Sequence, residues 1–96
     1  MTNYEIMYIV RPDLEESAIK NVHETFVKVL TDNGANVTEA KELGQKQLAY
    51  EIKKHNTGYY FLINLEAEND KALKEFDRLA LISEDIIRHL IIKLDK

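Results

Sequence analysis

Hydrophobic and polar residues alternate most clearly in the middle of the chain. From Leu48 to Ile52 apolar side chains alternate with polar or small ones, which is the two-residue period of a strand with two unlike faces. Residues 59–65 form a second, almost wholly apolar run, typical of a more buried strand. Residues 55–58 between them contain an asparagine and a glycine, which tolerate the positive φ of a short turn. The pattern predicts a long β-hairpin.

Two amphipathic helices are predicted, one before and one after the hairpin. The first begins near Asp13, where residues 13–16 match a capping box, and it ends at Gly34, which suits a left-handed stop. The second begins with Asn69 as its N-cap. Apolar residues recur at three- and four-residue steps in both helices, so one stripe of each faces a core. The stripes are Ile19, Val22, Phe26, Val29 and Leu30 in the first helix, and Ala72, Leu73, Phe76, Leu79 and Ala80 in the second.

Further strands complete the pattern. Residues 3–10 are apolar on both faces and are predicted to form a central strand, and residues 86–94 are predicted to form the last one. Another strand begins at residue 35, with the odd-numbered residue Val37 facing inward. From Leu48 onward the apolar residues of this strand are at even-numbered positions instead. We expect either a bulge at Gly44, or a hairpin whose far half extends past the helices and packs on something else.

The order strand, helix, strand, strand, helix, strand predicts an α+β fold, the ferredoxin-like split βαβ arrangement (βαββαβ), as one domain over residues 1–96. Right-handed crossovers place the first and third strands in the middle of a four-stranded antiparallel sheet. Both helices then cover one face, and the other, here called the bare face, has no helix over it. An apolar patch of this kind usually binds something. Parity assigns to the bare face Met7, Ile9, Tyr60, Leu62, Leu90 and Ile92.

Charge and composition exclude several classes of function. The net charge of −4 argues against a protein that grips nucleic acid with its whole surface, although the 13 lysines and arginines allow a local basic patch. The absence of cysteine removes disulfides, thiol catalysis and Cys-ligated zinc, and it fits a reducing cytosol. No apolar run approaches the ~20 residues of a membrane span, and no secretory signal is visible, so we expect a cytoplasmic protein.

No group of residues predicts an active site. His23, His55 and His89 have no partner four residues away and no Glu-x-x-His setting, so a metal site is not expected. His89 has the parity of the helix-facing side, and we expect it to be partly buried and satisfied. Ser17 and Ser83 lack the setting of a nucleophile, and there is no glycine-rich phosphate loop. We expect no catalysis, no metal and no cofactor.

Basic residues carry the better functional signal. Arg88 is the strongest candidate because it lies in the last strand beside the bare face, and a guanidinium group can bind phosphate through two hydrogen bonds. Lys46, on the hairpin, has two explanations: contact with a ligand, or protection of an edge strand against pairing with another chain.

The hairpin carries the segment Gly44-x-Lys46-Gln47-Leu48-Ala49-Tyr50-x-Ile52-Lys53. This segment resembles the most characteristic one of a known family, protein six of the bacterial small ribosomal subunit. The similarity extends over essentially the whole chain, in order and at similar spacing. The other matching positions are Tyr4-Glu5, Pro12, Gly34-Ala35-x-Val37, Glu42-Leu43-Gly44, Gly58-Tyr59-Tyr60 and Arg88.

This resemblance implies the ferredoxin-like fold and a ribosomal RNA-binding protein, not an enzyme. Members of the family join the central domain of the small-subunit RNA during assembly, paired with a basic ribosomal protein, number eighteen. A basic partner would help a chain of net charge −4 to enter an RNA particle, because affinity for RNA comes largely from phosphate neutralisation. The resemblance assigns RNA contact to Tyr4, Lys46, Arg88 and Lys93. We expect contact with the protein partner at Met7, Ile9, Tyr50, Tyr60, Leu62, Leu90 and Ile92.

The sequence departs from the family pattern in several places. Basic residues often precede the matching tyrosine in the family, whereas this chain has Thr2-Asn3. Many members have proline where this chain has Glu51, and two arginines where it has Lys46-Gln47. Many also continue in a tail that helps to hold the partner. Since this sequence ends at Lys96, we expect partner contact to rely more on the sheet.

Two other hypotheses come from different classes of protein. A homodimeric regulatory domain of ferredoxin-like fold would bind a small molecule and bury the bare face against a copy of itself, and sedimentation of the purified chain would detect that dimer. A small hydrolase of the same fold would need a phosphate loop with an arginine, which this sequence does not offer.

Overall fold

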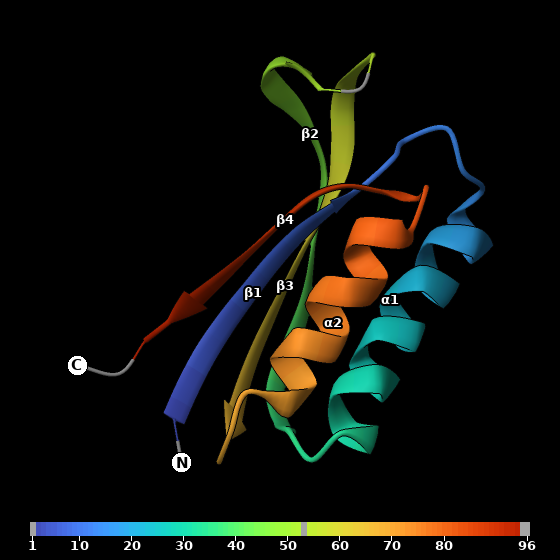
Figure 1. Cartoon of the computed structure of the whole chain (residues 1–96). Helices are drawn as coiled ribbons and strands as arrows, with labels where there is room; N and C mark the ends of the chain where they lie inside the picture. The colour runs from blue at the N-terminus through green and yellow to red at the C-terminus, as the bar shows by residue number, and fades with distance from the viewer. Residues whose placement is uncertain (1, 53, 95–96) are drawn as a thin grey trace.

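Four antiparallel strands form one sheet, and two helices pack side by side on one of its faces (Figure 1). The computed structural model describes residues 2–52 and 54–94, and only the backbone of Ile52. The strand order β2-β3-β1-β4 confirms the ferredoxin-like βαββαβ arrangement, with β1 and β3 in the middle. The elements are β1 (Thr2–Val10), α1 (Glu16–Asp32), β2 (Asn36–Ile52), β3 (His55–Ala67), α2 (Lys71–Ile82) and β4 (Ile86–Lys93).

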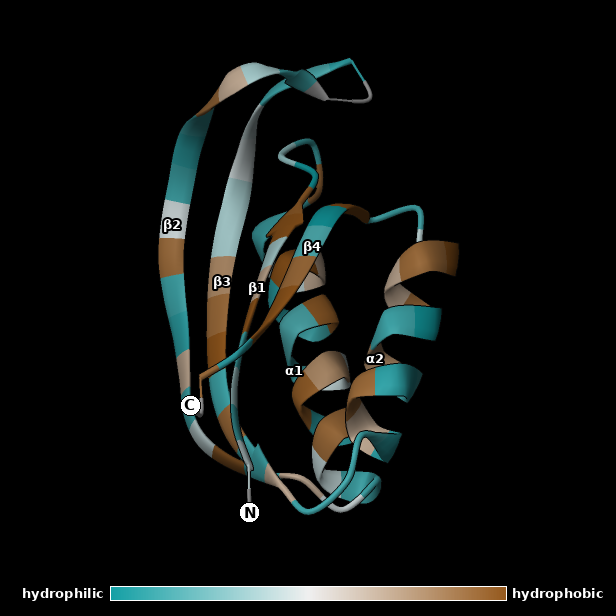
Figure 2. Ribbon diagram, turned by 60° about the vertical axis from the view of Figure 1, so that its left-hand side comes forward, coloured by the Kyte–Doolittle hydropathy of each residue, from teal (hydrophilic) through white to brown (hydrophobic). Residues whose placement is uncertain are grey.

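The core lies between the helices and the sheet. Even-numbered positions of β1 point into it, and Ile6, Tyr8 and Val10 are fully buried. Each helix buries one stripe, as predicted, and Phe26 of α1 meets Phe76 of α2 with ring centroids 4.9 Å apart. Burial of one such large apolar side chain contributes about 1.5–3 kcal/mol. Figure 2 shows that the helices cover only this side of the sheet.

One polar pair lies within this core. The hydroxyl of Tyr8 in β1 is hydrogen-bonded to Nδ1 of His23 in α1, and the His23 ring stacks on Phe61 with centroids 4.6 Å apart. Burial, reinforced by the charge of Glu42, raises the pKa of Tyr8 far above its usual value. Burial lowers the pKa of His23, although nearby Glu42 opposes this shift. The pair is therefore a neutral phenol and a neutral imidazole, each of which supplies the hydrogen bond that the other needs away from water.

The first helix begins later than predicted. α1 starts at Glu16, with Glu15 in the N-cap position and no side-chain capping hydrogen bond. Asp13 was expected to cap this helix, but its carboxylate instead pairs with Nε of Arg11 at 2.8 Å. The predicted capping box was wrong because a local ion pair competes for the same carboxylate.

The predicted end of the first helix is confirmed. Gly34 follows α1 with a φ of +93°, the left-handed conformation that only glycine adopts without strain. The N-cap position of α2 is held by Asp70 and not by Asn69, so that prediction was wrong by one residue. Oδ1 of Asn69 still accepts a hydrogen bond from the backbone N–H of Lys71 at 3.0 Å, because Asn69 lies just before the N-cap.

The turn between β2 and β3 lies earlier than predicted. β3 already begins at His55, and Lys54 has a φ of +69°. Asn56 and Gly58 are strand residues without positive φ, so the turn role predicted for them was wrong. Gly58 is needed for space instead, because an added Cβ would stand 2.2 Å from Cγ2 of Ile9.

Two bulges interrupt β2, and their effects on the alternation cancel, so the apolar residue Leu48 lies on the opposite face from Val37. The pairing of β2 with β3 shifts between Val37 and Glu39, and again between Glu42 and Gly44, where Gly44 has a φ of +87°. Each bulge reverses the alternation once, so the second restores the parity of the first segment. Val37 therefore faces the helices, and Leu48 faces the opposite side. Both expectations hold, since a bulge is present at Gly44 and the far half of the hairpin also extends beyond the helices (Figure 2).

Replacing Gly58 with alanine should lower the free energy of unfolding by about 1–3 kcal/mol, because the new methyl group overlaps Ile9 in a packed site. Urea denaturation measures the loss. Ile9→Ala removes the obstructing atom, so the double variant should lose less stability than the two single variants together. Strictly additive losses would show that the contact with Ile9 is not the cause.

Lowering the pH from about 7.5 to about 5.5 should destabilise the fold through His23, because a free histidine gains its proton in this range. The pKa of His23 is lower in the folded state, so the unfolded chain binds more protons as the pH falls. Urea denaturation across this range should show a falling free energy of unfolding. His23→Asn should flatten the profile, whereas His55→Asn should not. A flat wild-type profile would disprove the effect.

Candidate functional site

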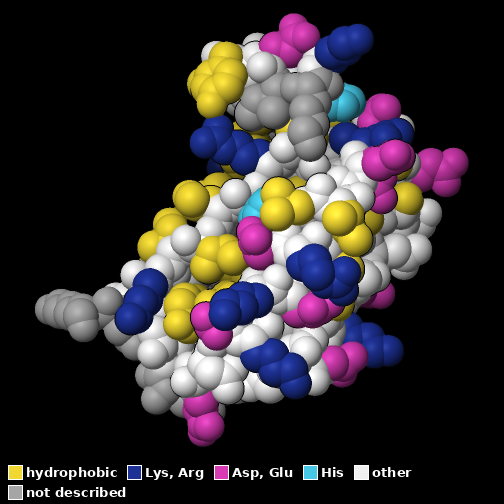
Figure 3. Space-filling model, in the orientation of Figure 1, with side chains coloured by type: hydrophobic (Ala, Val, Ile, Leu, Met, Phe, Trp, Pro, Cys, Tyr) yellow, Lys and Arg dark blue, Asp and Glu magenta, His cyan; other side chains and the backbone are white. Residues whose placement is uncertain are grey.

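The bare face carries the six apolar residues that their parity assigned to it. Met7 pairs with Leu62 in β3 and with Leu90 in β4, and residues paired in this way project to the same side. Leu90 is 52% exposed and Ile92 is 38% exposed. Figure 3 shows hydrophobic side chains in a row along the outer side of β4. We call this set the apolar strip: Met7, Ile9, Tyr60, Leu62, Leu90 and Ile92.

Arg88 lies at the hairpin end of the apolar strip. It pairs with Ile9 across β1 and β4, which places it on the bare face. Its Nη1 donates a hydrogen bond to the hydroxyl of Tyr50 at 2.8 Å, so the last strand is linked to the far half of the hairpin. A hollow of about 210 Å³ opens beside the guanidinium group. Its lining consists of Met7, Ile9, Tyr60, Arg88, His89 and Leu90.

Leu48 holds the far half of the hairpin over the ends of the other strands. It is buried in a small cluster with Ile9 and Ile87, and Tyr60 packs against this cluster. The cluster is separate from the main core on the helix side. Leu48 therefore gives the hairpin an apolar contact of its own, and this contact positions the polar residues on either side of it.

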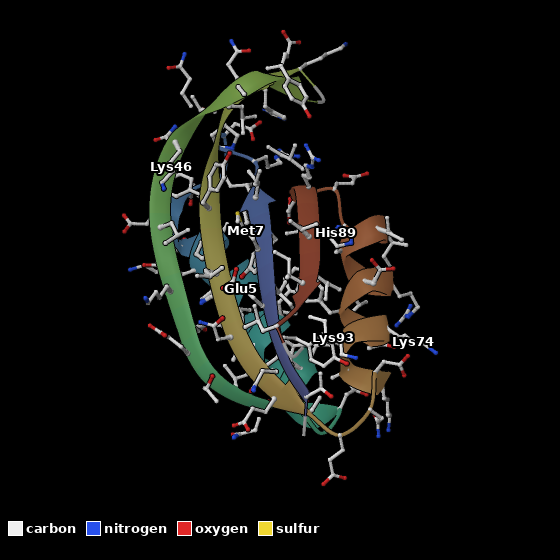
Figure 4. The ribbon with its side chains drawn as sticks, turned by 90° about the vertical axis from the view of Figure 1, so that its left-hand side faces the viewer. Glu5, Met7, Lys46, Lys74, His89 and Lys93 are labelled. Carbon is white, nitrogen blue, oxygen red and sulfur yellow. The ribbon has the colours of Figure 1, made fainter. Side chains whose placement is uncertain are left out.

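Lys46 also lies at this end of the bare face. Its Nζ is 5.8 Å from the centroid of the Tyr60 ring, within the range of a cation–π interaction. Lys46 pairs with Gly58 in β3, on the same parity as Tyr60 (Figure 4). Lys46, Tyr50 and Arg88 are thus brought to one end of the sheet from three separate parts of the sequence.

The structure places the other two predicted RNA-contact residues elsewhere. Tyr4 and Lys93 pair with each other at the opposite end of β1 and β4. Tyr4 has the parity of the helix-facing side and packs against the main core. Lys93 is exposed beside it, near the start of α2 (Figure 4). The four residues therefore form two groups, one at each end of the sheet and on opposite faces.

The histidine in the last strand has a structural partner. Nε2 of His89 lies 2.6 Å from Oδ1 of Asp77 in α2, and its side chain is mostly buried, as predicted. Within residues 2–52 and 54–94, no three histidine or carboxylate side chains lie close enough together to hold a metal ion. No helix in the same part of the chain has the length and apolar character needed to cross a membrane.

Two polar residues at the other end of the bare face are marked by no motif in the sequence. Glu5 and Asn64 pair with each other across β1 and β3, two positions beyond Met7 and Leu62 (Figure 4). Oδ1 of Asn64 is buried and has no hydrogen-bond partner among the described residues. Parity alone would have placed both residues on this face, but it gives no sign that their oxygens lack partners.

A larger hollow, of about 470 Å³, lies on the other side of the molecule between α1 and α2. Val22, Phe26 and Leu79 contribute apolar lining, and Asp85 contributes a carboxylate. No lysine or arginine lines it, so its charge does not suit phosphate. The bare face therefore remains the better candidate for a site that meets RNA.

Comparison with known proteins identifies the family and supports the fold. The model of the family described as ribosomal protein S6 matches residues 3–93. A crystal structure of the 30S ribosomal protein S6 from Thermotoga maritima is 27% identical and superposes with a TM-score of 0.92, covering 96% of this chain and 86% of that one. A protein from Arabidopsis thaliana, 8% identical, shares the fold with a TM-score of 0.55, covering 100% of this chain and 95% of that one.

Leu48→Ala should cost about 2–3 kcal/mol of unfolding free energy, because it leaves a cavity against Ile9 and Ile87. Leu90→Ala makes the same chemical change on the same face, but at an exposed position, and should cost less than about 1 kcal/mol. Urea denaturation of both variants measures the difference. Equal losses would contradict the anchoring role of Leu48.

Proposed function

This chain belongs to the ribosomal protein S6 family, and from that membership we propose that it binds ribosomal RNA in the small subunit beside a second, basic ribosomal protein. The RNA is the central domain of the small-subunit RNA, and the partner is protein number eighteen of that subunit. The role is structural, in the cytoplasmic ribosome, and uses no catalysis, cofactor or small-molecule substrate. The observation that carries the proposal is a bare apolar face with basic side chains at one end.

The apolar strip suits a protein better than it suits RNA bases. Sheets of this topology that bind single-stranded RNA carry aromatic rings on the central strands, on which bases stack. Here the central positions are Met7, Ile9 and Leu62, and Tyr60 is the one aromatic residue of the strip. Aliphatic side chains cannot provide a stacking platform, but they match the apolar core of a protein interface. We assign the strip, together with Tyr50, to the protein partner.

Lys46 and Arg88 suit contact with the RNA backbone. Both lie at the hairpin end, where the strip gives way to polar residues. Arg88 can present its planar donors to a phosphate, and Lys46 adds a second positive charge. Lys93, with Tyr4 beside it, would form a separate and smaller contact at the far end of β4. Since the whole chain carries a charge of −4, the basic partner supplies most of the phosphate neutralisation.

Family membership favours this function over the homodimeric small-molecule sensor. In both hypotheses a partner covers the bare face. That partner is the basic ribosomal protein in the first and a second copy of this chain in the second. A stable homodimer in sedimentation, together with no affinity for protein eighteen, would reverse the preference.

Lys46→Ala and Arg88→Ala should each weaken RNA binding by the heterodimer and reduce the slope of log K against log salt by roughly 0.7–0.9, as loss of one phosphate contact requires. Filter binding of a central-domain RNA fragment at several salt concentrations, with protein eighteen present, measures both effects. Lys93→Ala tests the second group in the same assay.

Two matched controls isolate the charge. Tyr50→Phe removes the hydrogen bond to Arg88 but leaves the positive charge of Arg88 in place. The slope of log K against log salt should therefore stay unchanged. Lys74→Ala removes a lysine that is paired with Asp70 on the helix side, and it should leave RNA affinity unchanged. If Arg88→Ala behaves like Lys74→Ala, Arg88 does not contact RNA.

A further inference from the structure

We propose that Glu5 and Asn64 form an acceptor site for a lysine or arginine of the protein partner, so that the bare face binds this partner in one orientation. The inference rests on the proposed function and deepens it, because it names the chemistry at the end of the strip farthest from the hairpin. Nothing in the resemblance assigns either side chain to a partner.

The register places the two side chains at the centre of the sheet. Glu5 and Asn64 are directly opposite each other in β1 and β3, and Glu5 is flanked on its other side by Ile92 of β4. Side chains paired in this way stand about 4.5–5.5 Å apart at Cβ, so a cationic group bound to the Glu5 carboxylate would lie next to the Asn64 amide, whose buried Oδ1 would turn outward to accept a hydrogen bond from it. Glu39 lies on the far side of Asn64, but its carboxylate is already paired with Lys41 at 2.9 Å.

Both oxygens lack a donor within the described part of the chain. Oδ1 of Asn64 is buried without a hydrogen bond, which costs about 1–3 kcal/mol unless water or a ligand supplies a donor. Glu5 is half-buried, and no ion pair to its carboxylate is present among the described residues. Two adjacent acceptors, one of them charged, are best satisfied by an N–H donor with a positive charge.

The surroundings favour the long side chain of a protein over RNA. Met7, Leu62 and Ile92 border the pair, and the aliphatic stem of a lysine or arginine packs well against such residues. A phosphate group would instead be repelled by Glu5. The bare face thus has an acidic end at Glu5 and a basic end at Arg88, with the apolar strip between them. A basic protein fits the first end and the RNA backbone fits the second.

The test is isothermal titration of protein eighteen into the intact chain at two salt concentrations. Glu5→Gln should weaken the complex by about tenfold, and less at high salt, because a charge-assisted hydrogen bond is lost. Glu39→Gln makes the same change in net charge on the same face, and it should weaken the complex by less than about twofold because that charge is already paired.

A third variant separates binding from folding. Asn64→Leu removes the unsatisfied oxygen, so the free chain should be at least as stable in urea while its affinity for protein eighteen falls several-fold. A role confined to the stability of the free chain would not give this combination. Loss of both stability and affinity would count against the acceptor site.

The remaining outcomes distinguish the inference from the proposed function. If Glu5→Gln binds like wild type while Leu90→Ser does not bind, the acceptor site is wrong and the proposed partner face stands. Equal weakening by Glu5→Gln and Glu39→Gln would mean a general charge effect and would overturn the site. Tighter RNA binding by Glu5→Gln with unchanged protein affinity would assign this end to RNA. If the wild-type chain binds neither protein eighteen nor RNA, the proposed function itself fails.

Discussion

Two helices can cover only one face of a four-stranded sheet, and the rest of this molecule follows from that limit. β1 is apolar on both of its sides. Tyr8 is therefore buried under the helices, whereas the adjacent residue Met7 lies on the bare face. The main core is complete without the second face, as the full burial of Phe76 shows. The exposed apolar residues of the second face, such as Leu90 and Ile92, are therefore not needed for this core, and they are best explained by a surface that a partner covers.

Much of the fold could be predicted from local patterns, because helix stripes and strand alternation are set by neighbours in sequence. The predictions were wrong where contacts between residues far apart in sequence, or competing local contacts, determine the role of a residue. Asp13 is a good capping residue, but Arg11 takes its carboxylate. Gly58 is a residue type typical of turns, but it lies within β3, where the side chain of Ile9 leaves no room for a Cβ atom. The bond between Tyr8 and His23 depends on how α1 lies on the sheet, which no local pattern specifies.

The candidate site was predictable in its apolar part and not in its charged part. Parity within each strand placed the strip on one face, since alternation is a local property. Alternation within β4 already places Lys93 and Arg88 on opposite faces, but bringing Lys46 and Arg88 to one end of the sheet required the register between strands. The contact between Tyr50 and Arg88 depends further on the path of the hairpin, and the unpaired oxygen of Asn64 is visible only once every neighbour is in place.

The paired bulges in β2 have a consequence for how this protein can change in evolution. The pairing with β3 passes over one residue at each bulge, Thr38 or Leu43, so loss of that residue would restore regular pairing and leave Leu48 on the side of Ile9 and Ile87. Loss of a paired residue would instead shift the register or the face of the side chains that follow it. Length variation in this strand among descendants of this gene should therefore concentrate at Thr38 and Leu43, and the spacing from Gly44 to Leu48 should be the least free to change.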